Sequence, residues 1–183
     1  SVVLFGVVLF NYGTFNDKLA LSSAGQEIAI TVRQAQSYGL NVKEAESGSG
    51  DFKKAYGVYF SPNDPYNYYI FVDKNSNNFY DVGTGSCGSV TTECVEQFLI
   101  RDGVRISSIC AYVSNVLTCP PIGANHLHVT FLRPNPDANI NFTSSPASGL
   151  THASWPTAGI RLISPKSTTT VVLIEQTGQV YSQ

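Results

Sequence analysis

Residues 2–10, VVLFGVVLF, form an apolar run broken only by Gly6, and residues 21–39, LSSAGQEIAITVRQAQSYG, follow with a helical repeat. In the second stretch Ala24, Ile28, Val32 and Ala35 recur every three or four residues, which places their side chains on one face of an α-helix. Gly39 is expected to end the helix. We therefore expect one continuous helix over residues 1–40, apolar on all sides in its front half and amphipathic in its back half.

The two halves of this helix predict two sets of contacts. A helix that is apolar all round is stable only in lipid or among other helices. The residues expected to form such a filament core or membrane segment are Val2, Val3, Leu4, Phe5, Val7, Val8, Leu9, Phe10, Tyr12, Phe15 and Leu19. The residues expected to pack the helix on the rest of the chain are Leu21, Ala24, Ile28, Val32, Ala35 and Tyr38. The apolar run by itself is too short to cross a bilayer core of about 30 Å. Because the domain is expected to cover only the back half of the helix, the front half needs a membrane or copies of itself.

The composition excludes several classes of protein. Of the 183 residues 13% are charged and 43% hydrophobic, and the net charge is −2. Disordered chains combine low hydrophobicity with high charge, and non-specific nucleic-acid binders need a basic surface, so we expect neither. The chain has no phosphate-binding glycine loop, G-x-S-x-G nucleophile or H-E-x-x-H motif, and we therefore expect no enzymatic activity.

From residue 57 onward the sequence changes to short apolar runs separated by turn residues, the pattern of β-strands. Strands are expected at 57–60, 68–72, 96–100, 104–109, 126–132, 139–142, 160–163, 169–175 and 179–182. The Asp102-Gly103 pair predicts a hairpin between the third and fourth of these runs. We expect an α+β fold in which the long helix, residues 1–47 with its following loop, packs on an antiparallel β-sheet domain, residues 48–183.

Four cysteines, Cys87, Cys94, Cys110 and Cys119, lie within 33 residues. An even number of cysteines in a turn-rich chain indicates disulfides and an oxidising environment. No Cys-x-x-Cys pair is present, which makes a zinc site the weaker interpretation. We favour the two short loops, Cys87–Cys94 and Cys110–Cys119.

One loop has oxygen-bearing side chains at the spacing of a calcium loop. Asp73, Asn75, Asn77 and Asp81 fall at loop positions 1, 3, 5 and 9, which suits the oxygen ligands of Ca²⁺, although position 12 is Thr84 and the usual bidentate Glu is missing. A metal-free Asx turn explains the same residues. Structural calcium and the metal-free turn both stay open, and no other cofactor is expected.

The histidines indicate a metal site less strongly than this loop does. His126 and His128 are two residues apart on an expected strand and so point to the same face, but His152 is the only further histidine and no third ligand is evident. We expect them to bond neighbouring loops rather than a metal.

The order of the apolar start and then FNYGTFNDKLALSSAGQEIAITVRQAQSYG, residues 10–39, resembles type IV pilins and type II secretion pseudopilins, most closely pseudopilin H and the FimT-like pilins. The C-terminal TTTVVLIEQTGQVYS, residues 168–182, fits as well. Members of that superfamily carry a basic leader, a peptidase-cut Gly, a methylated Phe and an early glutamate; none is present here, and we infer that part of the helix lies upstream of Ser1.

The resemblance implies a structural subunit of an extracellular, type IV pilus-like filament that polymerises through its N-terminal helix. Its implied partners are copies of itself, the inner membrane that anchors it before assembly, and the pilus or secretion assembly machinery. The alternatives are a minor pseudopilin or minor pilin that primes or caps a secretion or pilus machine, and a DNA-binding competence pilin. The scattered Lys and Arg residues argue against nucleic acid as a partner. An adhesin is a further alternative, which the aromatic-rich chain permits.

Overall fold

The computed structural model describes residues 2–41, 50, 53–113, 115–121, 124–144 and 155–183, with the side chains of the helix described from Phe15 onward. Over these residues the chain forms one helix and ten strands. They are α1 (Val2–Leu40), β1 (Ala55–Phe60), β2 (Asn67–Asp73), β3 (Cys94–Leu99), β4 (Arg105–Val113), β5 (Val116–Thr118), β6 (His126–Leu132), β7 (Asn135–Thr143), β8 (Thr157–Ile163), β9 (Thr169–Glu175) and β10 (Val180–Ser182).

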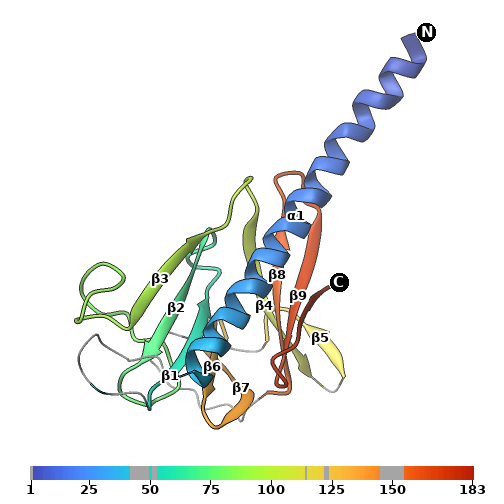
Figure 1. Ribbon diagram of the computed structural model, residues 1–183. Helices are drawn as coiled ribbons and strands as arrows, with labels where there is room; N and C mark the ends of the chain where they lie inside the picture. The colour runs from blue at the N-terminus through green and yellow to red at the C-terminus, as the bar shows by residue number, and fades with distance from the viewer. Residues whose placement is uncertain (1, 42–49, 51–52, 114, 122–123, 145–154) are drawn as a thin grey trace.

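The strands form two antiparallel five-stranded sheets, and α1 packs across them (Figure 1). The first sheet has the order β3-β2-β1-β6-β7 and the second the order β10-β9-β8-β4-β5. The α+β class with an antiparallel β domain is thus as the sequence predicts, and the domain consists of two sheets. The helix contacts β1, β6 and β7 of the first sheet and β8, β9 and β10 of the second, so its back half lies over the junction between them.

Two turns of the domain join paired strands, and the turn predicted as a hairpin does not. β1 pairs with β2 across the turn that begins at Ser61, and β9 pairs with β10 across Gly178, whose φ is 82°. The hairpin predicted at Asp102-Gly103 is wrong. The turn exists, with φ of 57° and 70° at these two residues, but β3 pairs with β2 in one sheet and β4 pairs with β5 and β8 in the other. The turn therefore connects the two sheets.

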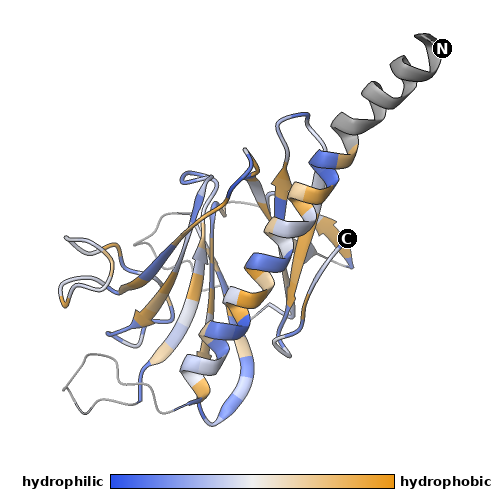
Figure 2. Cartoon of the chain, turned by 45° about the horizontal axis from the view of Figure 1, so that its top comes forward, coloured by the Kyte–Doolittle hydropathy of each residue, from blue (hydrophilic) through white to orange (hydrophobic). Residues whose placement is uncertain are grey.

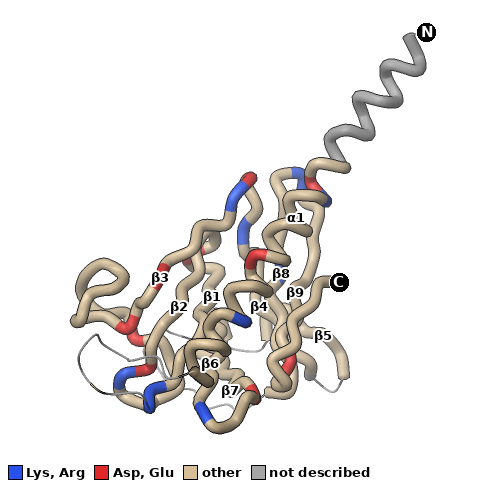
Figure 3. Tube along the Cα trace, in the orientation of Figure 1, with Lys and Arg blue, Asp and Glu red and all other residues tan. Residues whose placement is uncertain are grey.

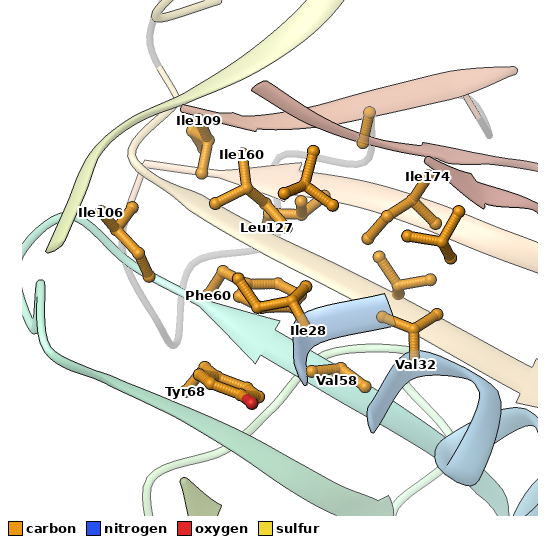
Figure 4. Packing of buried hydrophobic residues seen from close by; sticks show 14 of the residues in the cluster. Ile28, Val32, Val58, Phe60, Tyr68, Ile106, Ile109, Leu127, Ile160 and Ile174 are labelled. Atoms are coloured by element: carbon orange, nitrogen blue, oxygen red, sulfur yellow. The ribbon is translucent and has the colours of Figure 1, made fainter. Parts of the chain in front are cut away.

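The main core lies between the two sheets and α1 (Figure 4). Ile28 and Val32 of the helix point toward Val58 and Phe60 of β1 and toward Ile174 of β9. All five side chains are fully buried. Because alternate residues of a strand point to opposite faces, the other face of the first sheet carries a different set, which forms a second, smaller core with Tyr80.

Gly39 has a different role from the stop that the sequence suggests. The helix continues to Leu40, and a Cβ atom on Gly39 would lie 2.4 Å from the carbonyl oxygen of Phe131. The absence of a side chain therefore lets the end of α1 approach the backbone of β6 closely. The boundary predicted at residue 47 lies outside the described residues, as do residues 42–49 between α1 and the domain.

Candidate assembly interface

The back half of α1 is fixed to the domain by one apolar stripe. Leu21, Ala24, Ile28, Val32 and Ala35 are each at most 6% exposed, and they are the residues that the helical period selects. Fully burying a large aliphatic side chain contributes about 1.5–3 kcal/mol, so this stripe is enough to hold the helix in a fixed place. The remaining predicted residue, Tyr38, is partly buried and meets the ring of Tyr56 edge to face, with 5.7 Å between the ring centroids.

Two polar contacts complete the anchor. The Thr31 hydroxyl donates to the carbonyl oxygen of Glu27 at 3.0 Å and lies 3.2 Å from the Tyr68 hydroxyl; burial raises the pKa of Tyr68 to about 12, so this phenol stays neutral. Nearer the N-terminal end of the helix, a carboxylate oxygen of Asp17 accepts a hydrogen bond of 2.8 Å from the hydroxyl of Ser164, which follows β8. Asp17 is 8% exposed. This contact holds α1 near the point where it leaves the domain.

Three apolar residues on the opposite side of α1, here called the exposed stripe, are exposed, and the polar Ser23 and Gln26 lie between the second and the third. Phe15, Leu19 and Ile30 are 66%, 59% and 63% exposed. At about 100° per residue the three fall within about 60° of one another on the helix, and about 180° from the buried stripe centred on Ile28. Figure 2 shows hydrophobic and hydrophilic residues alternating along this part of the helix.

The predicted filament-core residues divide at Phe15. Phe15 and Leu19 are exposed, whereas the side chains of Val2, Val3, Leu4, Phe5, Val7, Val8, Leu9, Phe10 and Tyr12 lie outside the described residues. Their backbone belongs to α1, which extends beyond both sheets (Figure 1). Among the described residues no helix has a segment long and apolar enough to cross a membrane.

The structure contains both disulfides that the cysteine spacing favours. Cys87 is bonded to Cys94, which begins β3, and Cys110 of β4 is bonded to Cys119 after β5. Each closes a short loop at one edge of a sheet. Covalent closure of this kind suits a domain that functions outside the cell.

The predicted calcium ligands meet in one loop, where hydrogen bonds join them to one another and to the backbone. The carboxylate of Asp73, which is 1% exposed, accepts the backbone N–H groups of Asn77 and Asn78 at 3.0 and 2.8 Å. The side-chain amides of Asn75 and Asn77 donate to Asp81 at 2.6 and 2.8 Å. Within the described residues no group of three or more His, Cys, Asp or Glu side chains could hold a metal.

Buried polar residues fasten this loop to the first sheet. His128 Nδ1 accepts the backbone N–H of Tyr80 at 2.9 Å, so the ring proton is on Nε2, which lies 3.0 Å from Thr143 Oγ1. Burial lowers the pKa of His128 to about 3, and the ring is therefore neutral. The carboxylate of Glu93 accepts the backbone N–H groups of Lys74 and Asp81. Burial raises the pKa of Glu93.

His126 and the lone tryptophan, Trp155, also contact neighbouring residues of the domain. His126 Nδ1 lies 2.6 Å from the Tyr59 hydroxyl, so both strand histidines bond neighbouring residues, as expected. His152 lies outside the described residues. Trp155 packs edge to face on Phe142, with 5.6 Å between the ring centroids.

Basic and acidic residues are interspersed along the described part of the chain. Figure 3 shows basic residues beside acidic ones along the trace, for example Lys18 beside Asp17 and Arg101 beside Asp102. A duplex-binding surface requires Lys and Arg gathered on one face. The arrangement therefore offers no support for the competence-pilin alternative.

Sequence reasoning missed two features of this interface. Ile30 belongs to the exposed stripe. Its spacing of fifteen residues from Phe15 places the two on the same side of a helix, and this spacing was the available signal. The bond between Asp17 and Ser164 joins residues 147 positions apart, and no local pattern could indicate it.

Comparison of the chain with models of known protein families, with curated proteins and with solved structures found no match.

Proposed function

We propose that the protein is a structural subunit of an extracellular filament of the type IV pilus kind. In this proposal copies of α1 pack together at the centre of the filament and the two-sheet domains face outward. The observation that carries it is the division of α1 into a buried stripe and an exposed one. Leu19 and Phe15 continue the exposed stripe toward the apolar run of residues 2–10, and the single chain does not cover these two side chains.

Membrane and filament offer the front half of α1 similar surroundings. Residues 2–10 can sit in the apolar part of a bilayer before assembly and among identical helices afterwards, so the transfer changes the free energy of burial little. Close packing and dispersion between the helices then favour the ordered bundle. The assembly machinery of a pilus or secretion system would move the subunit between the two states.

The anchoring of α1 supports this role mechanically. A subunit that is held by its helix must transmit force from the helix to its domain. The buried stripe around Ile28 and the bond from Asp17 to Ser164 fix the helix over nearly its whole back half. The two disulfides close loops of the domain covalently, which suits the outer layer of a filament.

A pair of matched substitutions tests the proposal. The full chain is purified in detergent, the detergent is removed, and assembly is measured by sedimentation and negative-stain electron microscopy. Leu19→Asp should keep the protein out of the pellet, because a charge in an apolar helix interface is costly. Val90→Asp introduces the same charge at a loop valine that is 70% exposed and should assemble as the wild type does. Normal fibres from Leu19→Asp would contradict the proposal.

A further inference from the structure

A pocket of about 410 Å³ opens on the side of the first sheet that faces away from α1. Its floor is the outer face of β1 and β2, where Tyr59 and Tyr69 point away from the main core. One wall is the edge strand β3 with Gln97, and the other is the loop between β2 and β3. Figure 1 shows this loop at the outer edge of the domain, beside β3. Ligand sites usually measure about 300–1,000 Å³, so the pocket suits a small molecule.

The loop wall is held in place, so the pocket is already formed without a ligand. The Cys87–Cys94 disulfide ties the loop to β3, and the backbone N–H of Tyr80 is bonded to the buried His128. Gly83 approaches the opposite limb of the loop so closely that a Cβ atom would lie 2.3 Å from the carbonyl oxygen of Thr91. A preformed site of this kind loses little ordering entropy when it binds.

The lining combines one aromatic surface with uncharged polar groups. Tyr69 is partly exposed and stacks on Tyr80 with 5.8 Å between the ring centroids. Burial and the neighbouring carboxylate raise the pKa of Tyr69, so its hydroxyl keeps its proton and donates it to Asp64. Ser86 and the exposed Gln97 add a hydroxyl and an amide.

Among the residues that line the pocket Asp64 is the only charged one, and its environment limits the ligand. Its negative charge disfavours anions. Each of its oxygens already accepts a hydrogen bond, one from the Asn67 amide at 2.7 Å and one from Tyr69, which still leaves lone pairs for a donor from a ligand. An organic cation held in an aromatic cage would need several ring faces around it. Here Tyr59, Tyr69 and Tyr80 pack on one another with centroids 4.9–6.1 Å apart, which leaves no cage between them.

We infer that this pocket binds a neutral carbohydrate, a mono- or disaccharide. The apolar face of a sugar ring would lie on Tyr69, its hydroxyl groups would donate to Asp64, and Gln97 would exchange hydrogen bonds with it. The inference does not rest on the filament proposal, because the pocket belongs to the domain of a single chain. In a filament with α1 at the centre, however, the pocket would face outward.

Saturation-transfer difference NMR on the full chain tests the inference. The protein is kept in a polyoxyethylene detergent, which has neither a sugar nor a choline headgroup. The probes are the methyl glycosides of glucose, galactose, mannose and N-acetylglucosamine, with choline chloride as the cationic rival. At least one glycoside should receive saturation, and choline should not. Absence of transfer to every glycoside, or transfer to choline alone, would overturn the inference.

Variants then locate the binding. Tyr69→Ala should abolish the transfer, and Gln97→Ala, at an exposed position, should weaken the Kd about tenfold, the change that one hydrogen bond accounts for. The matched control is Tyr181→Ala, because the hydroxyl of Tyr181 also donates to a carboxylate, that of Glu175 at 3.0 Å, and Tyr181 lies outside the pocket. It should bind as the wild type does. If Tyr69→Ala unfolds, Gln97→Ala decides alone, and unchanged binding there would overturn the assignment.

Discussion

Two isoleucines on α1 allow the same substitution to test both apolar stripes. Ile28 is fully buried and Ile30, two residues later, is 63% exposed on the other side of the helix. Ile28→Ala leaves a cavity beside Val58 and Phe60 and should cost about 2–5 kcal/mol of unfolding free energy. Ile30→Ala should change the stability by less than about 0.5 kcal/mol. Urea unfolding followed by the fluorescence of Trp155 measures both; the Ile28→Ala midpoint should fall by at least about 1 M.

Assembly should respond in the opposite order. Ile→Ala removes three carbon atoms, and each contributes about 0.8 kcal/mol when it leaves water completely. Because 63% of Ile30 is exposed in the single chain, its burial between subunits should contribute about 1.5 kcal/mol to each subunit added. Ile30→Ala should therefore raise the critical concentration for assembly about tenfold, while folded Ile28→Ala assembles nearly normally. Equal stabilities for the two variants would refute the packing of α1, and an unchanged critical concentration for Ile30→Ala would refute the role of the exposed stripe.

Three further predictions concern the domain. Replacing Cys110 and Cys119 by Ser opens a loop whose ends are nine residues apart and should cost about 2–3 kcal/mol in urea unfolding; a loss near zero would contradict this. Burial lowers the pKa of His128 from an ordinary 6.5 to about 3 in the folded chain. Between these pH values the unfolded chain binds more protons, so the free energy of unfolding falls as the pH drops below 6.5. Wild type should therefore lose more stability than His128→Gln between pH 7 and 4.5, and equal losses would contradict the buried neutral ring. Hydrogen bonds within the loop from Asp73 to Asp81 hold it without a metal, so the thermal midpoint should be the same in calcium as in EGTA; a higher midpoint in calcium would show that the loop binds metal.

The sequence allowed the helix and its buried stripe to be predicted because both depend on one local period. Ile28 and Val32 repeat at helical spacing, and a single chain segment contains the whole signal. The same period also connects Phe15 with Ile30, but an exposed apolar residue becomes informative only when the buried face is known.

The arrangement of the strands could not be predicted in the same way. Asp102 and Gly103 adopt the left-handed conformations that a tight turn requires, but turn chemistry does not decide whether the two flanking strands pair. β3 pairs with β2, and β4 pairs with β8 in the other sheet. The short β5, of three residues, carries too little pattern to be recognised.

The candidate pocket was beyond sequence reasoning for a related reason. β1 is buried on both faces, because the loop after β2 folds back over the outer face of the first sheet. The contact between Tyr80 and His128 joins residues 48 positions apart, and neither residue signals the other. Tyr69 and Asp64 were therefore visible only as members of a strand and a turn.

The packing of α1 against other copies of α1 is tested most directly by cryo-electron microscopy of the full chain after detergent removal. The account predicts fibres in which helices run together along the centre and the two-sheet domains lie outside them. Single particles that stay dispersed in detergent-free buffer, with Phe15 and Leu19 covered by their own domain, would contradict it.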